Sequence, residues 1–140
     1  MTQVAKGTFY VSMKPLSIEN TSQEGKLGRM SIDKTISGDL IARTKGQMLT
    51  AGTVVQGSAG YVAIEQVSGT LSGRSGTFIL QHTATMNRGE PVMDVHVVPD
   101  SGTGELTGLE GNFKIQIVDG QHKYEFSYRI ADQDESAGGT

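Results

Sequence analysis

The sequence predicts an all-β fold: a closed or nearly closed antiparallel barrel of about eight strands. Three observations support this. Short runs of alternating apolar and polar residues are separated by turn signals at intervals of ~8–12 residues. Glycine contributes 19 of the 140 residues, about twice the usual ~7%, which is typical of tight turns and bulges. No long window shows the 3.6-residue apolar period of a helix.

The first and last expected strands alternate most clearly. Residues 5–14 have an apolar and a polar face, and Pro15 ends this run because it cannot donate to a strand ladder. In residues 122–130, alternate aromatic and apolar residues from Tyr124 to Ile130 face inward. Between them we expect strands at residues 26–34, 35–44, 47–55, 61–69, 77–85, 92–98 and 113–117. Closure of these strands into a barrel would remove exposed edges.

Turn chemistry separates the expected strands. Asp119-Gly120 lies between two alternating runs and has the composition of a tight hairpin turn. The other expected turns and loops are Lys45-Gly46 and residues 20–25, 56–58, 86–91 and 100–104. We expect residues 1–131 to form one barrel domain and the acidic residues 132–140 to form a disordered tail.

Composition excludes several classes of function. The chain has no cysteine, which rules out disulfides, thiolate metal sites and cysteine nucleophiles. Its net charge of −3 argues against a nucleic-acid partner. The sequence has neither an apolar stretch long enough to span a membrane nor a signal peptide, so we expect a cytoplasmic protein with no membrane partner. Nothing in the chain predicts a cofactor.

One fourteen-residue unit occurs twice, at residues 69–82 (GTLSGRSGTFILQH) and 104–117 (GELTGLEGNFKIQI). The copies share six identities, three of them glycines. We interpret each copy as the end of a strand, a glycine-bearing turn and a second strand, used twice in one architecture. Neither copy has the Lys-Ser/Thr pair and following helix of a phosphate-binding loop.

These two units also carry a resemblance to a known family. The stretches GYVAIEQVSGTLSGRSGTFILQH and VVPDSGTGELTGLEG resemble the bacterial family called domain of unknown function 3224, over residues 36–130. That family looks like the barrels of plant allene oxide cyclases and dirigent proteins. The second unit, followed by KYEFSYRI, is similar to the closing hairpin of the cyclases. The resemblance implies an allene-oxide-cyclase-like barrel with an interior cavity. It does not imply cyclase activity, because the cyclase's catalytic glutamate and cysteine have no counterparts at matching positions.

His82 is the main candidate for an interior polar site. In the second unit Phe113, Ile115 and Ile117 share the inward face. By the same register, Phe78 and His82 face inward in the first unit, so a histidine replaces an isoleucine. One interpretation is a core histidine bonded to a neighbour. The other is a group that contacts a ligand or transfers a proton.

Glu65 is the second candidate, and the pattern leaves its orientation open. The face with Tyr61 and Glu65 competes with the face of Val62 and Ile64. If Glu65 opposes Phe78 in the hairpin, then Tyr61 opposes His82 and all four point inward. A slip of one residue turns Glu65 outward into solvent. An inward Glu65 would need a partner, because an unpaired buried carboxylate is costly.

The other titratable residues give weaker signals. We expect Arg74 to be a solvated turn residue, His96 to face outward and His122 to be exposed. A metal site formed by His82, His96 and Glu65 has no supporting spacing, so no metal is predicted.

Three functions remain open for such a barrel. The first is a module that binds a small apolar molecule, with Tyr61, Glu65, Phe78, His82, Phe113 and Phe126 as ligand-binding residues. The second is a cyclase- or isomerase-like enzyme that uses His82 and Glu65. The third is a structural barrel with a filled core that forms a homo-oligomer.

Overall fold

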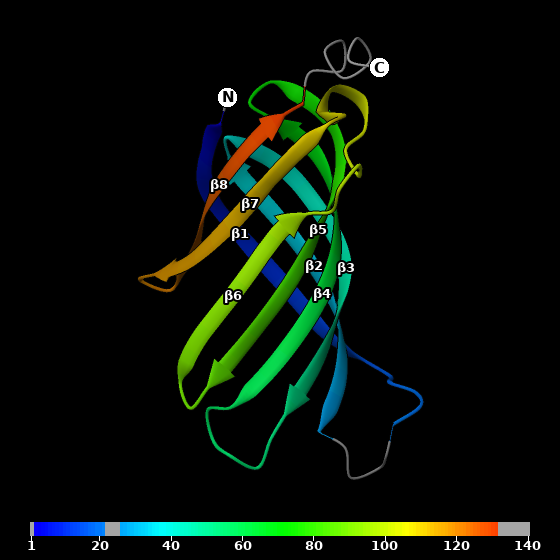
Figure 1. Cartoon of the computed structure of the whole chain (residues 1–140), viewed down its shortest axis with the longest axis vertical. Coiled ribbons are helices and arrows are strands. Elements are labelled where there is room, and N and C mark those ends of the chain that lie inside the picture. Colours follow the sequence, from blue (N-terminus) through cyan, green and yellow to red (C-terminus); the bar gives the residue numbers. More distant parts are fainter. Residues whose placement is uncertain (1, 22–25, 132–140) are drawn as a thin grey trace.

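A computed structural model describes residues 2–21 and 26–131 and shows an eight-stranded barrel (Figure 1). The strands run antiparallel in chain order around the barrel, which confirms the predicted fold class. No helix in the described residues is long and apolar enough to cross a membrane. The tail expected at 132–140 and part of the turn expected at 20–25 lie outside the described residues. The strands are β1 (Gln3–Leu16), β2 (Leu27–Gly38), β3 (Leu40–Gly52), β4 (Ala59–Leu71), β5 (Arg74–Asn87), β6 (Glu90–Val97), β7 (Leu109–Val118) and β8 (Gln121–Ile130).

Three hairpins have tight two-residue turns. Arg88 and Gly89 join β5 to β6 with φ angles of 49° and 91°, within the loop expected at residues 86–91. Ser72 and Gly73 join β4 to β5 with φ angles of 46° and 88°. Asp119 and Gly120 join β7 to β8 with φ angles of 52° and 78°, as the Asp-Gly pair predicted. Positive φ at both central residues matches the right-handed twist of the flanking strands.

Two predicted boundaries are wrong. The turn between β2 and β3 lies at Gly38-Asp39, where Gly38 has a φ of +108°, and not at Lys45-Gly46. Gly46 lies within β3, where a Cβ would stand 2.2 Å from the carbonyl oxygen of Ile64 on β4, so glycine permits close strand packing there. Pro15 does not end β1. The register of β1 with β8 stops at Phe9, so Pro15 lies where β1 pairs with β2 alone and a missing N–H is tolerated.

The second copy of the repeat differs from the prediction in its first half. Residues Gly104–Leu106 form a short 3-10 helix, η1, instead of the end of a strand. This segment packs beside β5: the N–H of Thr103 donates to the carbonyl of Thr77 at 2.8 Å. Leu106 is fully buried and belongs to the hydrophobic core. The two copies therefore share a turn and a following strand, but not the segment before the turn.

The β2–β3 and β4–β5 turns lie at the end of the barrel that is uppermost in Figure 1. Buried apolar side chains fill the interior at this end. We call this half the packed half; its fully buried side chains are Leu40, Leu71, Phe78, Leu106, Leu109 and Phe126. The rings of Phe78 and Phe126 stack at 5.9 Å between centroids, and Phe113 lies 5.4 Å from Phe126. Tyr124 fixes the β2–β3 turn, because its hydroxyl accepts from Leu40 N–H and donates to the carbonyl of Ser37.

The opposite half of the barrel has a less completely paired wall. The loops after β1, β3 and β5 lie at this end, which is lowest in Figure 1. We call it the hollow half. Here β6 pairs with β7 only at His96–Asn112, whereas β5 pairs with β6 over eight residue pairs. The wall between β6 and β7 therefore has few strand-to-strand hydrogen bonds.

Candidate functional site

A buried group of polar side chains lies between the two halves. Glu65 on β4 is fully buried, with an exposed fraction of 0%. Its Oε1 accepts from Lys34 Nζ at 3.1 Å and from His82 Nε2 at 2.8 Å. Its Oε2 accepts from the hydroxyl of Thr44. We call Lys34, Thr44, Glu65 and His82 the Glu65 cluster.

Strand register brings these four residues together. Lys34 lies opposite Thr44 across β2 and β3, and each follows the inward alternation of its strand. A hydrogen bond also joins the two residues: the backbone N–H of Lys34 donates to the Thr44 hydroxyl at 3.1 Å. Four neighbouring strands, β2 to β5, therefore each contribute one side chain to the cluster.

The register between β4 and β5 corrects one expectation. Glu65 lies opposite Leu80 and Ala63 lies opposite His82, so the pairing is displaced by two residues from the expected Glu65–Phe78 pair. The tight two-residue turn at Ser72-Gly73 sets this register. Because side chains alternate with a period of two, a displacement of two keeps Glu65 and His82 on the inward face. The inward orientation of Glu65, left open by the pattern, is the one observed.

The surroundings of Glu65 keep it ionised. Burial alone raises the pKa of this carboxyl, but the hydrogen bond from His82, the charge of Lys34 and the hydroxyl of Thr44 outweigh that effect and lower the pKa from 4.5 to about 2. The Glu65 carboxylate and the Lys34 ammonium also balance each other's charge in the interior. Burial, and then the negative charge of Glu65, raises the pKa of the nearby Tyr61 hydroxyl.

His82 has one ring nitrogen with a partner and one without. An ionised carboxylate only accepts hydrogen bonds, so the Nε2 that faces Glu65 carries a hydrogen. Nδ1 is buried and has no hydrogen-bond partner among the described residues. Buried polar atoms normally have a partner, and one that lacks it needs an explanation. A ligand atom is one group that can satisfy it.

His82 borders an apolar pocket of about 220 Å³ inside the barrel, the inner pocket. Lys34 lies on its wall with Nζ 4.8 Å from the centre of the Phe9 ring, a favourable cation–π arrangement. The ring of Tyr61 lies 6.3 Å from that of His82. The residues around the pocket are Phe9, Val11, Met13, Ile32, Lys34, Met48, Tyr61, His82, Met93, Ile115, Ile117 and His122.

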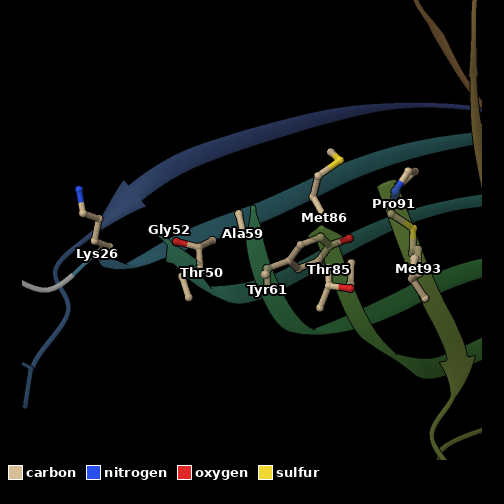
Figure 2. A pocket seen from close by; sticks show the side chains of 13 residues that line it. Lys26, Thr50, Gly52, Ala59, Tyr61, Thr85, Met86, Pro91 and Met93 are labelled. Atoms are coloured by element: carbon tan, nitrogen blue, oxygen red, sulfur yellow. The ribbon is translucent and has the colours of Figure 1, made fainter. Parts of the chain in front are cut away.

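A second pocket, of about 510 Å³, lies at the open end of the hollow half, and we call it the mouth (Figure 2). Tyr61 and Met93 line both the mouth and the inner pocket, so the two spaces adjoin. In Figure 2 the Tyr61 ring lies between Thr50 on one side and Thr85 and Met93 on the other. Small side chains, including Gly52, Ala59 and Ala84, leave this space unfilled.

The predicted site residues lie in two different regions of the barrel. Tyr61 and His82 line the inner pocket. Glu65 does not line it, but its carboxylate accepts a hydrogen bond from Nε2 of His82. Phe78, Phe113 and Phe126, expected to contact a ligand, do not line the inner pocket. They pack against one another in the packed half, because large rings at adjacent inward positions fill the space between them.

The remaining histidines and Arg74 lie as follows. His96 faces outward, as predicted, and its Nδ1 lies 3.0 Å from Asp94 Oδ2. Arg74 is exposed at the end of the β4–β5 turn. His122 was expected to be exposed, but it is half-buried on the wall of the inner pocket, with its ring 5.0 Å from that of Phe9. It shares the inward alternation of Tyr124, and that signal was available in the sequence.

Two members of the Glu65 cluster were not predicted. Lys34 and Thr44 lie at the ends of expected strands, where the alternation within each expected strand does not single out either as an interior residue. Lys34 has the same parity as the apolar Ile32 and Ile36, which would have placed it on the inward face. Over residues 2–21 and 26–131, no group of three or more metal-binding side chains lies close enough together to hold an ion.

The comparisons with known proteins agree with this fold. The family model for proteins of unknown function DUF3224 matches residues 5–128. A crystal structure of a protein with unknown function from the DUF3224 family of Shewanella oneidensis MR-1 is 50% identical. The match covers 94% of this chain and 99% of that one, with a TM-score of 0.90. A search of curated proteins gives no match. The chain belongs to the DUF3224 family.

Proposed function

We propose that the barrel binds a small, mostly apolar molecule in the inner pocket, with the polar end of that molecule beside His82. The observation that carries this proposal is the buried Nδ1 of His82, which lacks a partner in the described residues and belongs to a ring that borders an apolar pocket. Ligand sites in proteins are typically apolar spaces with a few placed polar groups. A cytoplasmic location is part of the proposal.

The size of the two pockets fits this ligand class. An engineered apolar cavity of about 150 Å³ holds benzene, and the inner pocket measures about 220 Å³. A single ring or a short alkyl chain would therefore fit inside, with any longer portion in the mouth. The presence of this pocket weighs against a structural barrel whose interior is filled.

A neutral fluorophore tests the proposal without favouring one ligand charge. We expect N-phenyl-1-naphthylamine to brighten on addition of the protein, and 1-octanol to displace it. The Ala84→Leu variant is the matched control, because Ala84 lines the mouth between Tyr61 and Met93 in the strand register. Its larger side chain should block binding and leave the fold intact. Absence of both fluorescence and any co-purified small molecule in native mass spectra would refute the proposal.

A second candidate is a cyclase- or isomerase-like enzyme that uses His82 and Glu65, and the hydrogen bond between these two side chains favours it. The carboxylate holds Nε2 of the ring and leaves Nδ1 as the free base, an arrangement suited to moving a proton. Such a base would remove a proton from carbon next to a carbonyl and return it. Proton–deuterium exchange of cyclohexanone in D₂O, followed by NMR, tests this. The candidate fails if wild type and His82→Gln exchange at the same rate.

A further inference from the structure

In the part of the chain that the structure describes, the titratable side chains that line the ligand space include no carboxylate. Lys34, His82, His122 and Tyr61 line the inner pocket, and each can donate a hydrogen bond or carry positive charge. Lys26 lies on the wall of the mouth. Among the described residues, no aspartate or glutamate lines either pocket. Glu65 does not, because it lies behind His82 and Lys34 and is bonded to both.

Charge balance within the Glu65 cluster limits what can join it. Lys34 and Glu65 already form an ion pair, so a second unaccompanied anion would leave a net negative charge in the interior. The free Nδ1 of His82 offers a remedy, because it can take up one proton. A carboxylate bound beside a protonated imidazole adds no net charge to the interior.

We propose that the ligand is a small apolar carboxylic acid, whose carboxyl group lies at Nδ1 of His82 and whose apolar part extends toward the mouth. This inference rests on the proposed function and names its ligand class. An acid is ionised in neutral solution, so its binding takes up one proton from the solvent. The proton lies between Nδ1 and the nearer carboxyl oxygen, and no covalent bond other than this N–H is formed.

The groups around His82 are consistent with one proton-accepting site. On β6, Val95 lies opposite His82, and Met93 of β6 and Ile115 of β7 line the same inner pocket; all three side chains are apolar. The titratable groups that share its surroundings are Glu65 and Tyr61 on β4, Lys34 on β2 and His122 on β8. Of these, His122 is the rival acceptor for the proton, and the test must separate the two histidines.

Calorimetry with octanoate and 1-octanol tests the ligand class. Titrations in two buffers with different ionisation enthalpies should show uptake of about one proton per octanoate and none per octanol. Because each octanoate takes up one proton, its affinity should fall as the pH rises. The octanol affinity should not change. If octanol binds and octanoate binds no more tightly, with no proton uptake, the ligand class is wrong and the proposed function stands. If neither binds, both are wrong.

Nitrogen-15 spectra of the wild-type histidines locate the proton without a mutation in the cluster. We expect octanoate to move the Nδ1 resonance of His82 from the unprotonated to the protonated range, and to leave His96 unchanged. The variants His96→Gln and His122→Gln assign the signals. A protonation signal from His122, or from no histidine, would overturn the role of His82. The Ala84→Leu variant should show no shift.

Discussion

The packed and hollow halves of the barrel are built on the same strands, but differ in the size of their inward side chains. In the packed half, β3, β4 and β5 place Leu40, Leu71 and Phe78 inside. At the other end of the same strands, the positions of the same parity include the small residues Gly52, Ala59 and Ala84, beside larger ones such as Tyr61. The alternation of inward and outward side chains is therefore the same in both halves of the barrel wall. The volume of the inward side chains decides whether the interior is filled.

The Glu65 cluster lies at the boundary between these halves. It is buried as completely as the core, yet it borders the inner pocket. Polar residues at this depth cost stability unless they are paired, and their position beside open space is the basis of the proposed ligand site. The following paired substitutions compare the halves, beginning with the largest expected effect.

Removal of a ring should cost most in the packed half. Phe126→Ala should lower the free energy of unfolding by about 3–5 kcal/mol, because Phe126 is fully buried and contacts three other rings. The matched variant Phe9→Ala borders a space that is already open, so it should cost less. Urea unfolding of both variants measures the difference. Equal costs would mean that the two halves are packed alike.

The boundary cluster should make stability depend on acidic pH. The pKa of Glu65 is depressed from 4.5 to about 2 in the folded protein. Its stabilising effect is thus complete above the unfolded value and is lost as the pH falls from 4.5 to about 2. The loss should amount to about 3 kcal/mol. Urea unfolding across this range should show a step that is absent from the Glu65→Gln variant; an identical pH profile in both proteins would contradict the lowered pKa.

The same added volume should have unequal consequences in the two halves. Ala5 is fully buried and pairs with Phe126, so Ala5→Leu should destabilise the protein by about 1–3 kcal/mol through overpacking. Ala84 is also buried, but it lines the mouth, so Ala84→Leu can extend into that space and should cost less than Ala5→Leu. Thermal and urea unfolding give both values. A large loss in Ala84→Leu would show that the mouth is not open space.

The smallest contrast concerns single hydroxyl groups. Tyr124→Phe removes the acceptor for the buried N–H of Leu40 and should cost about 1–2 kcal/mol. Tyr61→Phe, at the junction of mouth and inner pocket, should change stability by less than about 0.5 kcal/mol. If Tyr61→Phe proves the more costly of the two, Tyr61 has a structural role that these contacts do not reveal.

Much of the barrel was predictable because its signals are local. Alternation and turn chemistry placed the hairpin at Asp119-Gly120, and the repeat placed His82 on the inward face. The face of Glu65 was not predictable, since the outward side of β4 also carries apolar residues. Val62 is 50% exposed and Ile64 is 52% exposed, so both faces look equally apolar in the sequence.

The composition of the cluster depended on contacts that are distant in the chain. Lys34 and Glu65 are 31 residues apart and meet only because β3 lies between their strands. The alternation of β2 could have placed Lys34 inside, but it could not name Glu65 as its partner. The hollow half also needed the structure, because an unfilled space depends on the summed volumes of side chains from many strands.

The most direct test of a ligand site in the hollow half is a titration of the protein labelled with ¹³C in its methionine methyl groups. Met13, Met48 and Met93 line the inner pocket. Addition of octanoate should shift the methyl signals of Met48 and Met93 saturably in the wild type, with no shift in Ala84→Leu. Unchanged signals of both residues in the wild type at saturating octanoate would contradict the account.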